Sequence, residues 1–288
     1  MRYALVERHR GRYPVAMVCD AMEVSQSGYY AWRSRPESAR SREDRRLKVM
    51  IRSVFKESRE TYGSPRIHDE LRDQGIRCGR KRVARLLNEE GLRPKKARRF
   101  RRTTIAAPEH SKAENVLDRQ FSVESPDSVW AGDITYLWTR EGWLYLAVML
   151  DLFSRRVVGW AVSSSLSQEL AIRALDRAIF ERAPAPGLLH HSDRGSQYTS
   201  GQYRKRLEKH KLSASMSRKG DCWDNAVVES FFATLKVELG DSFSSRKAAH
   251  LALADYIEVF YNRKRRHTAI GGISPVEAEA RFAMKDAA

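Results

Sequence analysis

Three carboxylates in this chain stand in local settings that suit an acid that binds a metal ion. Asp133 lies within a run of strand type at 129–136, Asp193 follows a short apolar run, and Glu229 lies within a stretch of helical spacing at 224–236. Three carboxylates carried by two strands and a helix can converge on a pair of hard cations, which prefer oxygen ligands. Two such ions about 4 Å apart can stabilise both the attacking and the leaving oxygen of a phosphodiester. The three residues therefore predict phosphodiester chemistry.

The position of Glu229 on its helix can be tested by angle, at about 100° per residue. The apolar residues of this helix fall in one continuous stripe that we expect to face the core: Val228, Phe232, Leu235 and Leu239. Asn225, Glu229 and Lys236 line one edge of the helix beside that stripe. A carboxylate with a lysine two turns away can serve a metal ion and a DNA phosphate together. We therefore expect Glu229 to bind metal and Asn225 and Lys236 to contact DNA, although a lone glutamate here is more often a solvated surface residue.

Each aspartate also has a plain structural alternative. An aspartate within a strand is disfavoured. Asp133 is therefore either a catalytic residue or a carboxylate that lies on an edge strand or in an ion pair. Asp193 follows the carboxyl end of a strand, where open sheets place ligand sites, but turns favour aspartate as well. The three settings together are more specific than any one of them. We therefore assign Asp133, Asp193 and Glu229 as catalytic, metal-binding residues.

The elements that must position these residues predict a mixed sheet. Three consecutive strand-type runs joined by short polar turns should pair antiparallel: 130–138, 143–150 and 157–162. Helices then alternate with short strands: helix 167–181, strand 188–190, helix 200–209, strand 212–216, helix 224–239, and another helix near 247–260. This order predicts an α/β fold with helices on the faces of a mixed sheet.

Positive charge is concentrated in the first part of the chain. The chain has 288 residues and a net charge of +17. Residues 1–112 hold 29 lysines and arginines against 14 acidic residues, whereas residues 113–288 hold 24 against 22. A basic arm joined to a nearly neutral domain favours nucleic acid as the partner, because counterion release drives such binding. A basic surface that only maintains solubility is the alternative.

The basic part has the pattern of short helices. We expect an N-terminal helical segment at 1–40 and a helix-turn-helix-like DNA-binding domain at 43–102, in which Lys81, Arg82 and Arg85 face outward from the last helix. A basic arm ends this domain and should follow a phosphate backbone, through Lys95, Lys96, Arg98, Arg99, Arg101 and Arg102. A linker at 103–120 and a catalytic domain at 121–283 follow. A small helical bundle with a solvated charged face is the alternative for the first domain.

Other site classes and locations find little support. Three scattered cysteines without a Cys-x-x-Cys pair argue against a disulfide framework or a cysteine zinc site. His190 and His191 lack a second histidine or cysteine pair at ligand spacing, which favours a structural or substrate-contacting role. The N-terminus has no apolar signal core, and the longest apolar run, 143–150, is too short to cross a bilayer of about 30 Å. We expect a soluble, cytoplasmic protein with no membrane partner.

A set of motifs in this order resembles the OrfB component of the bacterial insertion-sequence transposases with two overlapping reading frames. That group is related to retroviral integrases through the DDE catalytic domain. The motifs extend over nearly the whole chain: Val24-Ser25-Gln26-Ser27-Gly28-Tyr29-Tyr30-Ala31-Trp32, Tyr62-Gly63-Ser64-Pro65-Arg66-Ile67, Trp130-Ala131-Gly132-Asp133-Ile134-Thr135-Tyr136, His191-Ser192-Asp193-Arg194-Gly195-Ser196-Gln197-Tyr198, Asp224-Asn225-Ala226, Glu229-Ser230-Phe231-Phe232, Tyr261-Asn262, Arg266-His267 and Ser274-Pro275.

The resemblance implies an RNase H-like fold in which Asp133, Asp193 and Glu229 form the DDE triad on two Mg²⁺ or Mn²⁺ ions, with Lys236 near the transposon end. It implies a transposase that nicks the ends of its element to free a 3′-OH and then uses that hydroxyl to attack another phosphodiester. The implied partner is double-stranded DNA, both element ends and target, in the nucleoid of a bacterial cytoplasm. Because two DNA ends must be paired, we expect at least a homodimer in the active assembly.

Two departures from relatives bear on partners. The chain lacks the N-terminal His/His/Cys/Cys zinc module of retroviral integrases. Family members also work as a frameshift fusion with an upstream protein that supplies a helix-turn-helix and a leucine zipper, and no sustained heptad repeat is present here, so an upstream-frame partner or fusion is implied. A metal-dependent nuclease that cuts without joining and a non-enzymatic DNA-binding regulator stay open as alternative functions.

Overall fold

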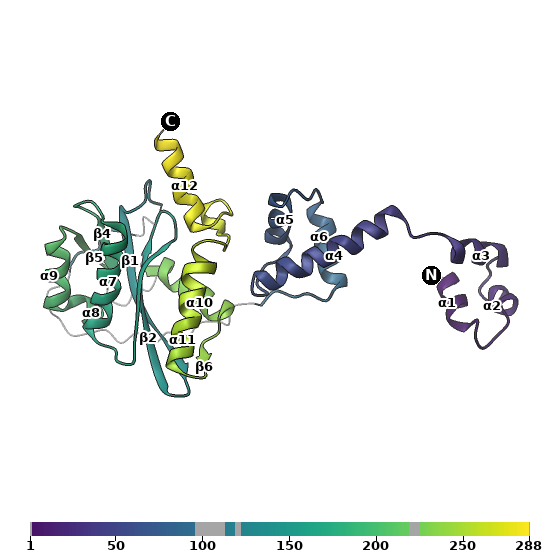
Figure 1. The fold of residues 1–288 in the computed structure, drawn as a ribbon, viewed down its shortest axis with the longest axis horizontal. Helices are drawn as coiled ribbons and strands as arrows, with labels where there is room; N and C mark the ends of the chain where they lie inside the picture. The colour runs from purple at the N-terminus through teal and green to yellow at the C-terminus, as the bar shows by residue number, and fades with distance from the viewer. Residues whose placement is uncertain (1, 96–112, 119–121, 219–224, 288) are drawn as a thin grey trace.

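The computed structural model of the chain describes residues 2–95, 113–118, 122–218 and 225–287. Two small helical units precede a larger unit built on a sheet (Figure 1). The first unit contains α1 (Arg2–His9), α2 (Val15–Ala21) and α3 (Gln26–Ser34), and the second contains α4 (Ala39–Glu57), α5 (Ser64–Asp73) and α6 (Arg80–Glu89). Each unit has its own buried core, with Val6, Cys19 and Tyr29 in the first and Ile51, Ile67 and others in the second. The pattern of short helices expected for the basic part of the chain is confirmed.

One mixed sheet organises the larger unit. Its strands are β1 (Val129–Thr139), β2 (Gly142–Asp151), β3 (Val157–Ser163), β4 (Leu189–Ser192), β5 (Ser213–Met216) and the short β6 (Ser242–Phe243). They run in the order β3-β2-β1-β4-β5, with β6 paired to β1 farther along that strand. β1, β2 and β3 pair antiparallel, whereas β4 and β5 continue the sheet parallel to β1. The predicted mixed sheet is confirmed.

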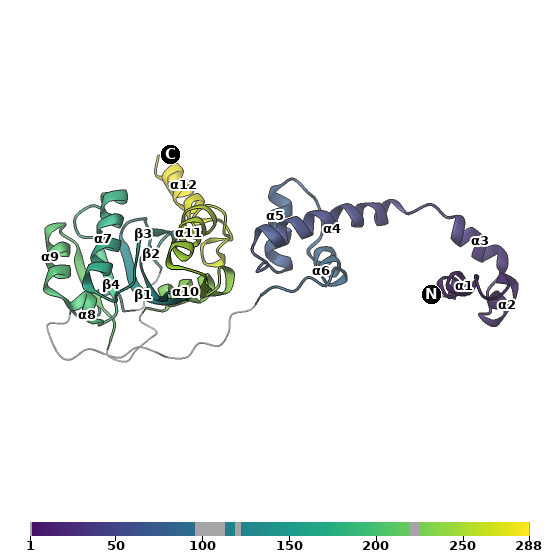
Figure 2. The ribbon, with the colours of Figure 1, turned by 60° about the horizontal axis from the view of Figure 1, so that its bottom comes forward.

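Helices cover both faces of this sheet (Figure 2). On one face, α7 (Gln168–Arg182), α8 (Ser196–Thr199) and α9 (Gly201–Lys209) bury a core that includes Trp130 and Met149. On the other, α10 (Ala226–Glu238) and α11 (Arg246–Ala254) bury a core that includes Ala131 and Leu137. Successive side chains of a strand point to opposite faces, so Asp133 shares the α10 face with Ala131 and Leu137.

The C-terminal part of the chain differs from the expected single helix at 247–260. After α11 the backbone continues as a wider π-helical segment, η2 (Asp255–Tyr261), followed by a single turn, η3 (Thr268–Ile270), and by α12 (Pro275–Asp286). The wider segment buries Tyr256, Ile257, Phe260 and Tyr261 together against the sheet. Among the described helices, none combines the length and the apolar character needed to cross a membrane.

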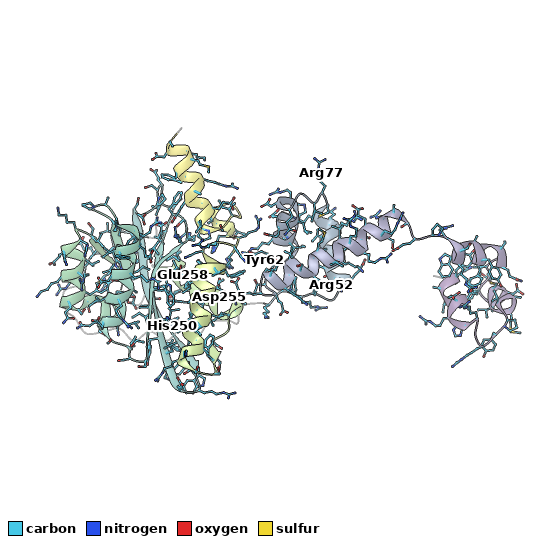
Figure 3. The ribbon with its side chains drawn as sticks, viewed as in Figure 1. Arg52, Tyr62, Arg77, His250, Asp255 and Glu258 are labelled. Carbon is cyan, nitrogen blue, oxygen red and sulfur yellow. The ribbon has the colours of Figure 1, made fainter. Side chains whose placement is uncertain are left out.

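The α4–α6 unit contacts this C-terminal part directly. The backbone N–H of Arg266 donates to the Tyr62 hydroxyl at 2.7 Å, and the Arg266 guanidinium donates to Glu70 at 2.6 Å. Arg59 pairs with Asp255 at 2.8 Å. Figure 3 labels Tyr62 of the helical unit and Asp255 of η2. The helical unit is therefore held against η2 and the segment that follows it.

Candidate active site

Asp133 lies within β1 and Asp193 directly follows β4, and these two strands are neighbours in the sheet. β4 runs parallel to β1, and its last paired couple is Gly132 with Ser192. Asp133 and Asp193 are each the next residue along the chain, so the two carboxylates leave neighbouring strands at the same level of the sheet. The Asp133 carboxylate accepts a hydrogen bond from the N–H of Ile134 at 2.7 Å. Asp193 accepts one from the N–H of Gly195 at 2.9 Å, which fixes it in a short turn.

Gly132 allows this close approach of the strands. A Cβ atom at Gly132 would lie 3.0 Å from the Met149 sulfur and 3.1 Å from Nε2 of His190. A larger residue would push against both side chains and shift the strand pairing immediately before Asp133. The glycine therefore contributes to the placement of Asp133.

Glu229 lies in the first turn of α10, on the same face of the sheet as Asp133. The predicted apolar stripe is confirmed for Val228, Phe232 and Leu235, which are buried. Asn225 precedes the helix and is buried, and its side-chain amide donates to the carbonyl of Gly132 at 3.3 Å. This bond ties the start of α10 to β1 directly beside Asp133. A carboxylate in the first turn is also favoured by the positive end of the helix dipole.

The charges of the three carboxylates act on one another. Burial raises the pKa of Asp133 well above its ordinary value, and the negative charges of Asp193 and, more weakly, Glu229 raise it further. Burial also raises the pKa of Asp193, against the opposing hydrogen bond from Gly195. Acidic oxygens that repel one another in a buried setting match the ligand preference of Mg²⁺ or Mn²⁺. Within the described residues, however, no three acidic, histidine or cysteine side chains stand close enough to form a complete metal site.

Lys236 lies two turns beyond Glu229 on α10, and its Nζ is 5.0 Å from the ring centroid of Tyr136. Tyr136 belongs to a cluster of exposed aromatic rings on the β1–β2 hairpin, in which Trp138 and Trp143 stack edge-to-face at 4.9 Å. The cation–π contact holds the ammonium group beside the strand that carries Asp133. Lys236 therefore lies between α10 and the strand that carries Asp133.

The other residues predicted to contact DNA differ in whether their charged groups are exposed or paired with acidic residues. Lys81 is exposed on α6, whereas Arg82 donates to Asp44 at 2.7 Å and Arg85 donates to Asp44 at 2.7 Å, so both guanidinium groups are engaged inside the helical unit. Lys95 pairs with Glu60 at 3.1 Å. The rest of the basic arm lies outside the described residues: Lys96, Arg98, Arg99, Arg101 and Arg102.

The two histidines before Asp193 have structural surroundings. His190 is fully buried, its Nε2 lies 2.8 Å from the Tyr203 hydroxyl, and burial followed by the charge of His191 lowers its pKa to about 3. His191 lies 2.9 Å from the Ser215 hydroxyl and 3.2 Å from that of Ser217. Both rings link β4 to neighbouring elements at positions just before Asp193 in the chain. Of the two roles expected for these histidines, structural or substrate-contacting, these hydrogen bonds support the structural one.

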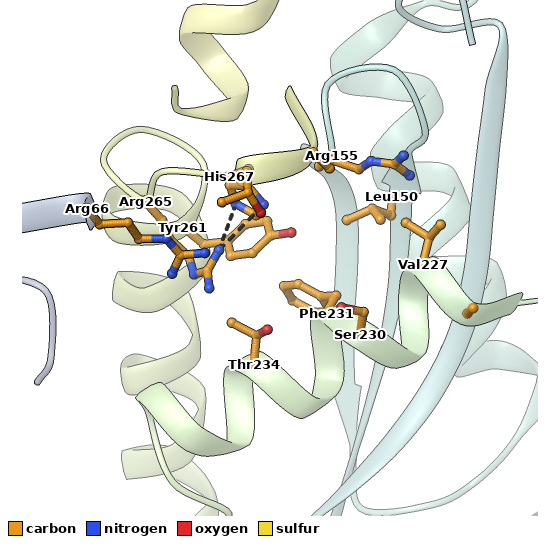
Figure 4. A pocket seen from close by; sticks show the side chains of 13 residues that line it. Arg66, Leu150, Arg155, Val227, Ser230, Phe231, Thr234, Tyr261, Arg265 and His267 are labelled. Atoms are coloured by element: carbon orange, nitrogen blue, oxygen red, sulfur yellow. Dashed lines mark hydrogen bonds between the residues drawn. The ribbon is translucent and has the colours of Figure 1, made fainter. Parts of the chain in front are cut away.

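A cavity of about 320 Å³ lies on the other side of α10 and was not predicted from the sequence (Figure 4). It is lined by Arg66 from α5, Arg155 from the turn between β2 and β3, and Arg265 from the segment after η2. Ser230, the residue after Glu229, is also part of its wall. The arginines come from three remote parts of the sequence, and no local spacing connects them.

Comparison with known proteins gives consistent matches along the chain. The HTH-like domain family matches residues 41–100, and two integrase core domain families match residues 123–222 and 210–275. Transposase InsF for insertion sequence IS3A of Escherichia coli (strain K12) is 42% identical over 283 residues, covering 97% of this chain and 98% of that protein. A 31 kDa protein of insertion element IS600 from Shigella sonnei, described as uncharacterized, is 43% identical over 267 residues, covering 92% of this chain and 98% of that protein.

A solved structure shows a more distant likeness. A chain of the simian T-cell lymphotropic virus intasome in complex with PP2A regulatory subunit B56 gamma has a TM-score of 0.47 and 17% sequence identity to this chain. The match covers 70% of this chain and 67% of that one.

Proposed function

Because the chain belongs to the IS3-type insertion-sequence transposases, which carry an integrase catalytic core, we propose that it nicks the ends of its element with Asp133, Asp193 and Glu229 and joins the freed 3′-OH to a new site. The chain is an enzyme of transposition and DNA integration, a polynucleotidyl transferase. The observation that carries the finer proposal is the placement of the acids. Asp133 and Asp193 follow the paired residues Gly132 and Ser192, and Asn225 ties the helix of Glu229 to the same Gly132.

The chemistry requires no nucleophile from the protein. Water attacks the phosphodiester at the element end, the bond from phosphorus to the bridging 3′ oxygen breaks, and a free 3′-OH remains. That hydroxyl then attacks a phosphodiester of the target, forms a new ester bond and displaces the target's own 3′ oxygen. Two Mg²⁺ or Mn²⁺ ions held by Asp133, Asp193 and Glu229 would supply positive charge to the attacking and leaving oxygens.

The chain's own groups have distinct roles in this proposal. Asp133 and Asp193 provide the pair of carboxylates on the sheet, and Glu229 provides the third from α10. Asn225 is a positioning residue, because its amide fixes the start of α10 to β1 at 3.3 Å. Lys236 is placed to contact a phosphate of the DNA end on the same side of the helix.

The proposed substrate is double-stranded DNA, as both element end and target. The HTH-like region at 41–100 supports DNA binding, and the division into a helical segment at 1–40, a DNA-binding domain at 43–102, a linker at 103–120 and a catalytic domain at 121–283 belongs to this proposal. Two ends must be held together for joining, so the proposal includes a homo-oligomer. An upstream-frame protein, separate or fused, is the further partner that the family relationship supports.

The test is cleavage and joining on a supercoiled plasmid that carries the element's own ends, with Mg²⁺. The wild type should give nicked and joined products, whereas Asp193→Asn should bind the DNA and give neither. Asp176→Asn is the matched control, because Asp176 is on α7 and pairs with Arg206 at 3.2 Å, away from the three acids. Nicked products without joined ones would replace the proposal by a nuclease. DNA binding unaffected by metal and by loss of the acids, with no product, would replace it by a regulator.

A further inference from the structure

The cavity shown in Figure 4, which we call the arginine pocket, is walled by four segments that are distant in the sequence. Arg66 reaches it from α5 of the helical unit, and Arg155 from the turn between β2 and β3. Ser230 and Thr234 contribute from α10, and Arg265 from the segment after η2. The pocket is therefore formed only when the helical unit lies against the catalytic unit.

The wall of the arginine pocket is strongly cationic. It contains three arginines, and none of its thirteen residues is an aspartate or a glutamate. Glu238, which lies behind the wall, accepts from Nε of Arg265 at 2.8 Å and neutralises that charge. Arg66 lies over the ring of Tyr62, with 5.3 Å between Cζ and the ring centroid. Among the residues that the structure describes, no carboxylate lies within ion-pair distance of Arg66.

The charge of Arg66 is unfavourable in this place without an anion. Burial, and then the neighbouring charge of Arg265, lower the pKa of Arg66. Burial, and then the positive charge of these guanidinium groups, also lower the pKa of His267, whose ring lies 3.4 Å from a terminal nitrogen of Arg265. Like charges gathered in a partly buried space repel one another, and a bound anion would turn that repulsion into attraction.

The chemistry of the wall favours a phosphate. Arginine presents a planar fork that matches phosphate oxygens, and serine or threonine hydroxyls donate to them as well. Ser230 follows Glu229 directly, so the pocket begins on the turn of α10 that carries the third acid. A DNA strand that runs from the three acids past the first turn of α10 would bring a backbone phosphate to this place.

We propose that the arginine pocket binds one backbone phosphate of the DNA strand being processed, held jointly by Arg66, Arg155 and Arg265. The proposal rests on the proposed function for the identity of the strand. It assigns a DNA-binding role to Arg66, which was not among the residues expected to contact DNA. The phosphate then joins the helical unit to the catalytic unit, because its ligands come from both.

The proposal is tested by binding, without turnover, to element-end duplexes in which one phosphate at a time is replaced by a neutral methylphosphonate. Measurements are made with the full chain in Ca²⁺. For the wild type, one position of the scan should lower affinity about tenfold through loss of a charge-assisted contact. Arg66→Ala should lower the affinity for unmodified DNA by a similar factor and reduce the slope of log affinity against log salt by about one. A methylphosphonate at that same position should not lower the affinity of Arg66→Ala any further.

Two variants separate this role from a structural one. Arg72→Ala is the matched control on the same helix, since Arg72 is exposed and does not line the pocket. It should keep the sensitivity of the wild type at the identified position. Arg155→Ala, in a different unit, should lose that sensitivity as Arg66→Ala does, which a local unfolding of α5 would not produce.

The outcomes separate the pocket from the catalytic proposal. If no methylphosphonate position distinguishes Arg66→Ala from the wild type, the pocket holds no DNA phosphate, whether or not the wild type nicks the plasmid in Mg²⁺. Calorimetry with inorganic phosphate provides the second arm. Binding of inorganic phosphate that depends on Arg66, with no sensitive DNA position, would assign the pocket to a free anion and overturn the proposal.

Discussion

Nε of Arg265 donates to both carboxylate oxygens of Glu238, at 2.8 and 2.9 Å, and both side chains are buried. The two residues join the end of α10 to the segment after η2. Tyr256 and Thr61 also donate to the same carboxylate, at 2.8 and 3.3 Å. Because Thr61 belongs to the helical unit, Glu238 is a point at which the two units and the catalytic helix meet.

Glu238→Gln should destabilise the protein by about 3 kcal/mol, because removing one partner of a buried ion pair leaves the other charge uncompensated. Urea unfolding followed by tryptophan fluorescence measures this change. Glu277→Gln is the control, since Glu277 pairs with Arg281 on the exposed side of α12 and such a pair contributes at most about 1 kcal/mol. Equal effects of the two substitutions would contradict the importance of the buried pair.

Arg266→Ala should loosen the contact between the helical unit and the catalytic unit. The side chain of Arg266 is mostly buried and donates to Glu70 and Asp73 at 2.6 and 2.5 Å. Loss of these bonds should accelerate hydrogen exchange about tenfold in peptides that contain residue 266, whose backbone N–H is held by the Tyr62 hydroxyl. Arg281→Ala removes an ion pair within α12 and should leave that exchange unchanged. Unaltered protection in Arg266→Ala would show that other contacts hold the units together.

Divalent cations should stabilise the folded protein through the three acids. In their absence the charges of Asp193 and Glu229 oppose ionisation of the buried Asp133. A cation that binds only the folded state, at about 100 times its dissociation constant, contributes about 2.7 kcal/mol. Thermal unfolding should therefore shift upward with Mg²⁺, Mn²⁺ or Ca²⁺, whereas Asp193→Asn should be more stable than the wild type without cations and respond little to them. Ca²⁺ should support little cleavage because its coordination is looser. A cation response that survives Asp193→Asn would place the ions elsewhere.

Much of the sheet and its acids was predictable because the signals are local. The alternation of β1 and β2 and the apolar stripe of α10 follow from residues a few positions apart. Asp133 departs from strand preference, and that departure marked it. The helical angle also predicted that Asn225 lies beside Glu229, but no local signal indicates that Asn225 is buried against Gly132.

The remaining features depend on contacts between remote segments. Arg82 and Arg85 were expected to face outward from α6, but both pair with Asp44 of α4. β6 has two residues and forms only because β1 extends past β4. The three arginines of the pocket meet only in the folded chain, as does the π-helical turn that buries Tyr261. Periodicity along a sequence carries no information on contacts between remote segments.

Lys236→Ala should reduce cleavage of specific element ends more than it reduces non-specific DNA binding. The Nζ of Lys236 is held beside Tyr136, and in the proposed function it contacts one phosphate of the end. We expect about a tenfold loss of end cleavage, with Lys236→Arg retaining most activity. Tyr136→Phe keeps the aromatic face and serves as the control. An equal loss of specific and non-specific binding in Lys236→Ala would indicate a general electrostatic role instead.

His267 should make the protein less stable in acid. Burial, and then the charges of Arg265, Arg66 and Arg155, lower its pKa to about 2, whereas an unfolded histidine has a pKa of about 6.5. Its ring also packs edge-on against Tyr261, with 4.8 Å between centroids. Below pH 6.5 the unfolded chain therefore binds a proton that the folded chain does not, and stability falls as the pH falls, by about 1.4 kcal/mol per pH unit.

Between pH 6.5 and 5 this residue should account for about 2 kcal/mol of lost stability. His267→Gln should reduce the slope of unfolding free energy against pH by about one proton over that range, as measured by urea unfolding at a series of pH values. An unchanged slope would mean that His267 accepts a proton in the folded state. Because a neutral His267 leaves the charge of the arginine pocket to its guanidinium groups, the Arg66-dependent part of DNA affinity should stay constant from pH 6 to 8. A pH-dependent contribution of Arg66 would instead require a protonated histidine in the pocket wall.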